Sequence, residues 1–363
     1  MDNRLIFANY FANWLVNYKA TIVQPATIQR NYDDYRKYIA GTKIDKLAIT
    51  DIKRIDIKIC LNNIINQYHL TRKALNNIKS LFNGMFAYAI DAEDIIVNPM
   101  LNLKIENTNI QVEPLKESST EIFNEQELNV LIEYLYHHYA ENRPMVTLAI
   151  LLNFQLGLRV GELCTLKKSD INFEHRTIRV NRTERSYRPI GLINGKIIAG
   201  KTIHDVTDGK TKSNSNRILD LSDEAVAIIN RTLHLQKELS IHSDYLFADD
   251  KGEHIIRQRI NDCLHFYCKQ LSLDTKSSHK IRKTVLSNLF AAGFDFEEVM
   301  QIAGHRNKET TLKYYLFSVR SKDDRQQRLT NALATNHCIF HQPSEIYGDS
   351  EPTGFESLVA PKI

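Results

Sequence analysis

Cysteine is scarce in this sequence, and its spacing fits neither cross-linking nor metal binding. The five cysteines are odd in number, and no two of them form a Cys-x-x-Cys pair. A disulfide framework or a zinc ribbon needs such pairs, so the pattern argues against both. Free cysteines are usual in a reducing compartment, and we therefore expect a cytoplasmic protein that holds no metal.

Long apolar runs and a dominant charge are also missing. No stretch of about 18 apolar residues occurs, so we expect no membrane span. The N-terminal residues show no cleavable signal pattern. Forty-seven Lys and Arg stand against 43 Asp and Glu, which gives a formal net charge of +4. This balance permits a nucleic-acid partner without requiring one.

The sequence does contain enough apolar material for two packed domains. Of its 363 residues, 43% are hydrophobic, which is usual for globular cores. Apolar residues recur at helical spacing through the first hundred positions, as at Leu75, Ile78 and Leu81. Residues 1–108 hold 14 Lys and Arg against 10 Asp and Glu. We therefore predict an all-α, basic domain over 1–108, and its charge fits either a clamp around DNA or an ordinary solvated helical bundle.

A change of character marks the end of this domain. Residues 109–122 are polar, include Pro114 and show no helical period, so we interpret them as a linker. Asn124 is followed three residues later by Glu127, which is typical of a helix start. A second domain is predicted over 123–336, and residues 337–363, which lack periodicity, are predicted to form a C-terminal tail.

Strand patterns occur only in the second domain. Ile178–Val180 and Arg217–Leu221 have the composition of strands, and a long polar excursion, 181–209, lies between them. Most of the remaining sequence has helical periodicity. The predicted fold class is therefore mainly α with a small antiparallel β-sheet (α+β) in the second domain, after an all-α first domain.

Two segments place arginines where they could hold a phosphate. Gly157 is expected to end an apolar helix and to leave Arg159 in a turn, with Glu162 near enough to hold its guanidinium. A guanidinium offers a planar pair of donors that matches two phosphate oxygens. His279 and Arg282 stand three residues apart at a predicted helix start, so they share a face near an anion-favouring helix end.

Three further segments are ambiguous by themselves. His305 follows a glycine beyond another predicted helix, and Tyr314 and Tyr315 are adjacent on the next one. Lys210 and Lys212 lie in a basic turn before the second strand. The ordinary interpretations of these patterns are a surface histidine, two packing tyrosines and a solvated turn.

The order of these residues carries the inference. Arginine, turn lysine, His-x-x-Arg, Gly-His and a tyrosine nine or ten residues later form the motif series of the tyrosine recombinases. The chain resembles the integrases of phages and mobile elements over nearly its whole length. The first domain is similar to their core-DNA-binding (SAM-like) domain, and the second is similar to their catalytic domain.

The resemblance implies a role for each residue. A tyrosine hydroxyl attacks a DNA phosphodiester and forms a 3′-phosphotyrosine, without a metal or nucleotide cofactor. Arg159 and Arg282 would hold the non-bridging oxygens, and His305 would add a hydrogen bond. Glu162 would support Arg159. The turn lysine would protonate the leaving 5′ oxygen, and His279 would assist proton transfer.

Two assignments stay open between near neighbours. For the nucleophile we favour Tyr315, because the two residues after it resemble the usual followers in the family, and Tyr314 is the alternative. For the lysine we favour Lys210, which stands in a Lys-Thr dipeptide common among relatives, over Lys212, which has the tighter spacing to the second strand.

The resemblance also implies partners. The expected substrate is the core recombination site of double-stranded DNA, held largely through its phosphates. The residues expected to contact it are Lys19, Arg30, Arg36, Lys37, Arg72, Lys73, Lys79, Lys212 and Arg217. A helix over 320–334 would dock on a neighbouring protomer to form a homotetramer on DNA. An accessory directionality factor is a further expected partner, and no separate arm-binding domain is expected.

The predicted activity is integration or excision of a mobile element or phage genome. Two features depart from the common pattern: Lys283 stands where many relatives have histidine, and the excursion 181–209 exceeds a simple hairpin. One alternative within the family is a Xer-like resolvase. Another is a DNA-binding protein of the same fold that does not cut.

Overall fold

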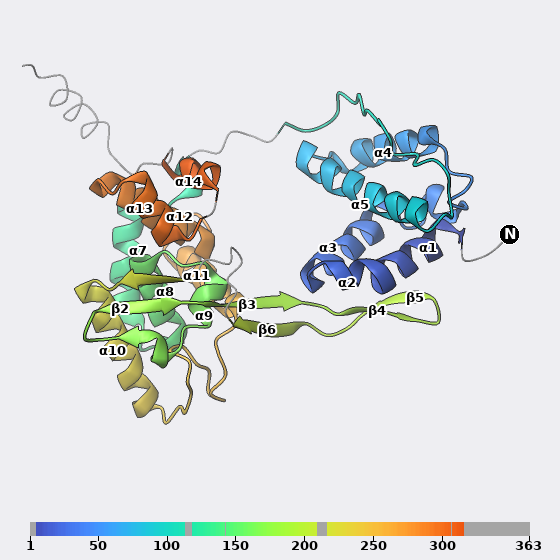
Figure 1. Cartoon of the computed structure of the whole chain (residues 1–363). Coiled ribbons are helices and arrows are strands. Elements are labelled where there is room, and N and C mark those ends of the chain that lie inside the picture. Colours follow the sequence, from blue (N-terminus) through green and yellow to red (C-terminus); the bar gives the residue numbers. More distant parts are fainter. Residues whose placement is uncertain (1–4, 113–117, 142, 209–215, 306, 316–363) are drawn as a thin grey trace, which may run out of the picture. The chain divides into compact units, whose positions relative to one another are not determined.

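The computed structural model describes residues 5–112, 118–141, 143–208, 216–305 and 307–315 (Figure 1). These residues form mostly α-helices with small antiparallel sheets, which confirms the predicted fold class. Within the described ranges, no helix has the length and apolar character needed to cross a membrane. The linker predicted at 109–122 lies partly outside the described residues, so the domain boundaries stay a prediction.

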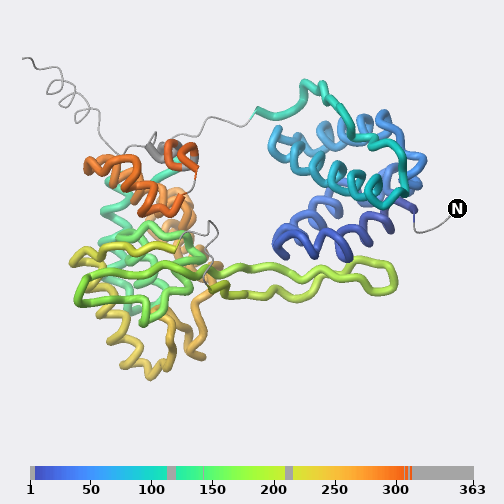
Figure 2. Tube along the Cα trace, in the orientation of Figure 1, coloured from blue at the N-terminus to red at the C-terminus, as the bar shows by residue number. Residues whose placement is uncertain are grey.

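The first hundred residues are helical, as their periodicity predicts (Figure 2). The elements are α1 (Phe7–Asn13), a π-helical turn (Trp14–Lys19), α2 (Ala20–Ile22), α3 (Pro25–Asp34), a second π-helical turn (Tyr35–Ile39), a 3₁₀ turn (Ile44–Lys46), α4 (Arg54–Tyr68) and α5 (Arg72–Asp91). Their apolar faces pack into one core, in which Trp14 is only 1% exposed. Thr71 begins α5 because its hydroxyl accepts the Ala74 N–H.

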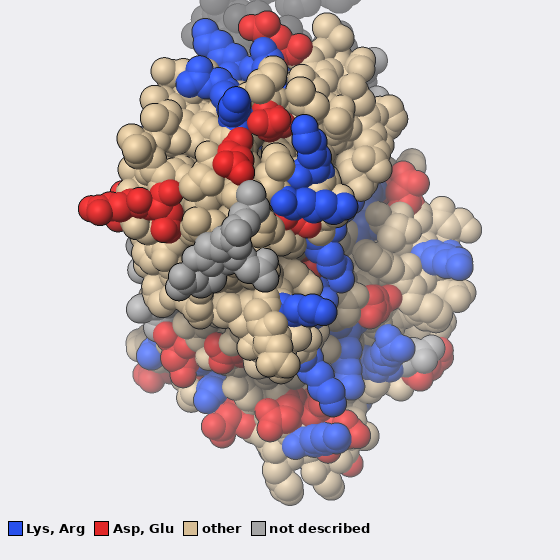
Figure 3. Space-filling view, turned by 90° about the vertical axis from the view of Figure 1, so that its right-hand side faces the viewer, with Lys and Arg blue, Asp and Glu red and all other residues tan. Residues whose placement is uncertain are grey.

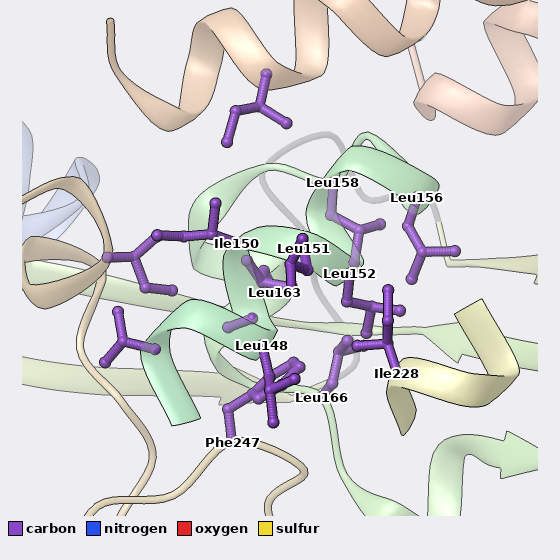
Figure 4. Close-up of a cluster of buried hydrophobic side chains, with 14 of the residues drawn as sticks. Leu148, Ile150, Leu151, Leu152, Leu156, Leu158, Leu163, Leu166, Ile228 and Phe247 are labelled. Carbon is purple, nitrogen blue, oxygen red and sulfur yellow. The ribbon is translucent and has the colours of Figure 1, made fainter. Parts of the chain in front are cut away.

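A second group of helices packs around a second core. Its members are α6 (Ser118–Glu121), α7 (Glu125–His138), α8 (Pro144–Leu156), α9 (Val160–Cys164), α10 (Asp223–Glu238), α11 (Arg257–Gln270), α12 (Ser278–Ala292), α13 (Phe296–Ala303) and α14 (Lys308–Tyr315). The start of α7 is as predicted, because Asn124 and Glu127 cap each other's backbone N–H groups. Helix α8 is apolar almost all round and lies at the centre of this core (Figure 4).

A small antiparallel sheet lies beside these helices. Its strand order is β1 (Ile171–Asn172), β2 (Thr177–Val180), β7 (Arg217–Asp220). In this sheet Val180, the last residue of β2, pairs with Arg217, the first residue of β7. The excursion therefore leaves the sheet and returns to it at neighbouring positions. Both strands expected from the sequence are therefore present and adjacent.

The excursion 181–209 forms a long two-stranded β-arm, which we define as residues 182–208 (Figure 1). Strand β3 (Arg182–Tyr187) pairs with β6 (Ile203–Asp208), and β4 (Ile190–Ile193) pairs with β5 (Lys196–Ala199). Ile190 and Ile197 pack against the core of the first helices. Arg188 Nη2 lies 2.9 and 3.1 Å from the carboxylate oxygens of Asp33 on α3.

Candidate active site

The turn between α8 and α9 holds Arg159 as the sequence predicts. Gly157 ends α8 with a φ of +59°, in the left-handed region that favours glycine. A Cβ at this position would lie 2.9 Å from Cγ1 of Val285 on α12, so the turn and that helix are in close contact. Arg159 then caps α9 in an extended conformation, and its Nη1 donates to Glu162 Oε1 at 2.9 Å.

Glu162 is a buried carboxylate shared by two arginines. The residue is 1% exposed, and its Oε2 accepts from Arg217 Nη2 at 2.8 Å and from the Arg159 backbone N–H at 3.2 Å. Burial opposes the charged form, but the charges of Arg217 and Arg159 outweigh it and hold the pKa of Glu162 below its usual range. Glu162 is therefore ionised at neutral pH and fixes two guanidinium groups.

Arg282 brings the second predicted arginine to the same place. It is 1% exposed on α12, and its Nη1 donates to the Gly157 carbonyl at 2.8 Å. Its Nη2 donates to the Ala303 carbonyl at 2.5 Å, at the end of α13. These bonds join the turn after α8 to the end of α13, 146 positions apart in the sequence.

His279 lies one turn before Arg282 on α12 and has an exposed side chain. Partial loss of hydration and the positive charges of Lys283, Arg282 and Lys280 lower the pKa of His279 to about 4. The imidazole is therefore neutral near pH 7 and able to accept a proton.

His305 is nearly buried, with 8% of the residue exposed. Gly304, with a φ of +61°, ends α13 and turns the chain so that His305 faces Arg282. Its Nε2 lies 3.0 Å from Arg282 Nη2, and its Nδ1 lies 2.8 Å from Thr311 Oγ1. Burial and the charges of Arg282, Arg159 and Arg217 lower the pKa of His305 to about 3.

The partners of His305 determine its tautomer. A guanidinium can only donate, so Nε2 of a neutral His305 must accept from Arg282. The proton of the ring then resides on Nδ1, which donates to the hydroxyl of Thr311. Thr311 is completely buried on α14, and the sequence did not point to it. Its spacing of six residues after His305 carried no signal that distinguished it from other helix threonines.

The two open assignments stay predictions. Lys210 and Lys212 lie outside the described residues. Tyr314 and Tyr315 are the last two residues of α14, which begins three positions after His305. The backbone therefore brings both candidates to the helix that contacts His305 through Thr311.

Eight of the nine basic residues expected at DNA are described, and they divide into three groups. Arg30, Arg36, Lys37, Arg72 and Lys73 are exposed, whereas Lys19 and Lys79 are half-buried. Figure 3 shows Lys and Arg side chains gathered in a band on the face drawn there. Arg217 differs from all of these, because its side chain is 8% exposed and pairs with Glu162. Arg217 therefore lies beside Arg159 at Glu162, and its contact with DNA stays a prediction.

No group of His, Cys, Asp and Glu in the described part of the chain has the geometry of a metal site. What the described residues assemble is a set of fixed guanidinium groups beside a neutral imidazole. Arginines held in this way can bind a tetrahedral anion through paired N–H donors. A phosphate group is the ligand that this chemistry fits best.

The chain is similar to known proteins in sequence and in fold. The model of the phage integrase family matches residues 121–319. A tyrosine recombinase XerC-like protein from Caldanaerobacter subterraneus subsp. tengcongensis is 27% identical, over 90% of this chain and 81% of its own. Tyrosine recombinase XerC of Staphylococcus aureus is 24% identical, over 79% of this chain and 85% of its own.

Solved structures share the fold. The Tn1549 transposon integrase in complex with a circular intermediate DNA has a TM-score of 0.64 at 17% identity, covering 90% of this chain and 99% of that one. A lambda integrase dimer bound to a core site has a TM-score of 0.57 at 15% identity, covering 87% and 95%. At these identities the likeness concerns the fold alone.

Proposed function

Because the chain belongs to the phage integrase family of tyrosine recombinases, we propose that it cuts and rejoins DNA at a specific site through a 3′-phosphotyrosine intermediate. One observation carries the proposal. Arg159, Arg282 and His305, which were selected from the sequence by their order, meet around the C-terminal end of α13. Three residues from distant segments would have no reason to converge in this way if each were an ordinary surface group.

The proposed reaction is a phosphoryl transfer in two steps. The tyrosine oxygen, with Tyr315 favoured over Tyr314, attacks phosphorus as its proton leaves. The bond to the 5′ oxygen of the next nucleotide breaks, and that oxygen receives a proton from the turn lysine, Lys210 or alternatively Lys212. A 5′-hydroxyl from the partner strand then attacks the phosphotyrosine and releases the tyrosine. The covalent bond conserves the energy of the phosphodiester, so the rejoining step requires no added energy source.

The described residues have separate parts in this scheme. Arg159 and Arg282 would bind the non-bridging oxygens, on which negative charge increases in the transition state. His279, neutral near pH 7, would accept the tyrosine proton. Glu162 would hold Arg159 in position through its 2.9 Å contact.

His305 has a more specific part than the sequence implied. In the structure its Nε2 accepts from Arg282, so it holds that guanidinium instead of offering a donor. To donate to a phosphate oxygen, as the resemblance implies, the ring must exchange its Nδ1 proton for one on Nε2 when DNA binds. Loss of the Arg282 contact in the DNA complex would accompany that exchange.

The biological setting that we propose is integration or excision of a mobile element or phage genome. The β-arm favours this setting over a resolvase, because its 27 residues between β2 and β7 exceed a simple hairpin. The similarity to XerC proteins keeps a Xer-like resolvase as the second candidate. A protein of this fold that only binds DNA is the third.

The proposed assembly follows from the same scheme. Double-stranded DNA is the substrate, and the exposed cations of the first helices would bind its phosphates with strong salt dependence. A homotetramer held by residues 320–334, an accessory directionality factor and a cytoplasmic location are parts of the proposal. Residues 320–334 lie outside the described part of the chain.

Covalent capture tests the chemistry and finds the target sequence in the same experiment. The full chain is incubated with a pool of nicked duplexes of random sequence, together with duplexes from the ends of the element that encodes it. Adducts that survive detergent are purified and their DNA is sequenced. We expect a protein-linked 3′ end at a recurring sequence, and mass spectrometry of the adduct peptide identifies the tyrosine.

Two variants decide between the candidates. Tyr315→Phe should abolish the adduct, and Tyr314→Phe should keep it; the opposite result assigns the reaction to Tyr314. A wild-type chain that binds the selected DNA and forms no adduct is a binding protein, and the enzymatic proposal then fails. A recurring sequence in the chromosomal terminus instead of the element ends would favour the resolvase.

A further inference from the structure

We propose that Arg217 is a positioning residue of the recombination site, which fixes Arg159 and the His305 turn without touching DNA. The inference rests on the proposed function, since it assigns a role in the same reaction. Arg217 is the first residue of β7 and comes from a strand, whereas Arg159 and Arg282 come from a helix cap and a helix. Its contacts reach Glu162 on α9 and the end of α13.

The first line of evidence is the end of α13. The last carbonyls of a helix have no partner within it and carry partial negative charge. Three successive carbonyls here each accept from a different arginine. Arg217 Nε donates to Ile302 O at 2.8 Å, Arg282 Nη2 donates to Ala303 O at 2.5 Å, and Arg159 Nη2 donates to Gly304 O at 3.4 Å.

Arg217 contacts the chain just before the turn that presents His305. Ile302, Ala303 and Gly304 are the three residues that precede His305. A shift of the Ile302 carbonyl would therefore move the histidine, and with it the contact to Arg282. Phosphoryl transfer depends on such positions because misplacement of about 1 Å can cost about 100-fold in rate.

The second line of evidence is the pairing with Glu162. Its two carboxylate oxygens are divided between Arg217 and Arg159, with contacts of 2.8 and 2.9 Å. Without Arg217, Oε2 keeps the longer contact with the Arg159 backbone N–H, at 3.2 Å. The carboxylate could then rotate toward water or the remaining arginine, and the Arg159 guanidinium would lose its fixed orientation.

Stability is a weak reason to bury Arg217. Buried ion pairs are often no more stabilising than well-packed apolar residues of the same size. In addition, Nη1 of Arg217 is buried with no hydrogen-bond partner among the described residues, which costs free energy. An apolar residue at this position would avoid that cost. The contacts to Glu162 and Ile302 are what an apolar residue would lose.

The third line of evidence is the charge near His305. The charged groups that face it in the described part of the chain are Arg282 on α12, Arg159 and Glu162 around α9, and Arg217 on β7. The arginines lower the pKa of His305, and Glu162 raises it. Arg217 therefore helps to keep the imidazole neutral, so that it can accept from Arg282.

The test compares variants of the full chain on the duplex selected by covalent capture. Arg217→Met is expected to slow adduct formation about 10- to 100-fold, the loss expected when groups of the site are misplaced by up to about 1 Å. DNA affinity, measured by fluorescence anisotropy, should stay within about twofold, because only the chemical step is affected. Arg176→Met is the matched control, since Arg176 is an exposed arginine beside β2 with an exposed partner, Asp223.

Two further measurements separate positioning from a general structural role. If Arg217 acts in part through Glu162, the loss of rate in Arg217→Met/Glu162→Gln should be smaller than the product of the two single losses, because the Glu162 contact is common to both variants and only the Ile302 contact is lost with Arg217 alone. The pKa of the His305 imidazole, followed by NMR, should also rise in Arg217→Met, because a cation near His305 is lost. Arg217→Lys should recover little of the rate, because an ammonium cannot form both contacts of the fork.

The outcomes are distinguishable. A wild-type chain without adduct overturns the proposed function, and this inference with it. If the wild-type chain forms the adduct and Arg217→Met forms it at a rate within about twofold of the wild-type rate, the inference alone is overturned. A loss confined to DNA affinity, which would show a direct contact, also overturns it, as does a double variant in which the two losses multiply. If Arg217→Met fails to fold by circular dichroism, Arg217→Lys and the double-variant comparison built on it decide.

Discussion

Glu121 offers a quantitative test of how the start of the second helical group is held against α12. It ends α6, is 6% exposed, and accepts from both Lys280 and Lys283, which flank Arg282 in the sequence. Two residues later, the Phe123 N–H donates to Thr284 Oγ1 at 2.8 Å. The end of the predicted linker and the residue after it are thus fixed to the helix that carries two of the proposed site residues.

The magnitude follows from the pKa of Glu121. Burial opposes ionisation, but Lys280 and Lys283 outweigh it and lower the pKa from 4.5 to about 2. At 1.36 kcal/mol per unit, the ionised carboxylate contributes about 3 kcal/mol at pH 7. The folded pKa is depressed, so this stability is present above pH 4.5 and is lost as pH falls toward 2. About half of it should remain at pH 3.

The change to test is Glu121→Gln, which keeps the shape and removes the charge. We expect the free energy of unfolding in urea to fall by about 3 kcal/mol at pH 7, and the difference from wild type to shrink as pH is lowered. Circular dichroism follows the whole chain, whereas fluorescence of Trp14, the only tryptophan, follows the first helical group. The variant should shift the circular dichroism transition, and the fluorescence of Trp14 shows whether the first helical group unfolds in the same transition.

Glu133→Gln is the matched control, because Glu133 is an exposed glutamate on α7 and should change stability by no more than about 0.5 kcal/mol. A Glu121→Gln loss that equals the control would refute the argument. A loss that stays constant between pH 7 and pH 3 would also refute it, because it would show that packing, and not the charge of Glu121, is responsible.

Two other substitutions probe the site itself. Thr311→Val should leave the Nδ1–H of His305 without its acceptor, cost about 1–3 kcal/mol in urea unfolding and slow adduct formation; Thr311→Ser should behave like wild type, and equal behaviour of the two variants would contradict the tautomer argument. Gly157→Ala should cost at least about 1–2 kcal/mol through the left-handed backbone alone, and more through contact with Val285. Unchanged thermal unfolding of Gly157→Ala would show that this turn tolerates a side chain.

Local sequence patterns anticipated most of the helices, because capping and periodicity are properties of neighbouring residues. Asn124 and Glu127 form the predicted capping box, and Gly157 ends α8 as expected. The strands β2 and β7 also occur where their composition indicated. The β-arm was recognised only as an excursion, since its pairing joins strands up to 26 residues apart in register.

The order of residue types along the sequence predicted members of the site, but it did not predict the contacts between them. The sequence selected Arg159, His279, Arg282 and His305 because their types and order match a family series. It did not reveal that Arg217 pairs with a buried carboxylate, because a basic residue beside a basic turn carries no sign of that partner. That carboxylate, on Glu162, lies 55 positions away.

The sequence by itself therefore determined the family and the fold class, and it selected Arg159, Arg282 and His305, which the structure brings together. Residue type and order are sufficient for this, because the chemistry of each group is intrinsic to it. Only the tertiary structure decided how those groups are held. The three arginines meet at one helix end because α9, α12 and β7 converge on the last carbonyls of α13. The tautomer of His305 depends on Thr311 for the same reason: a hydrogen-bond partner is fixed by position in space, which no local pattern records.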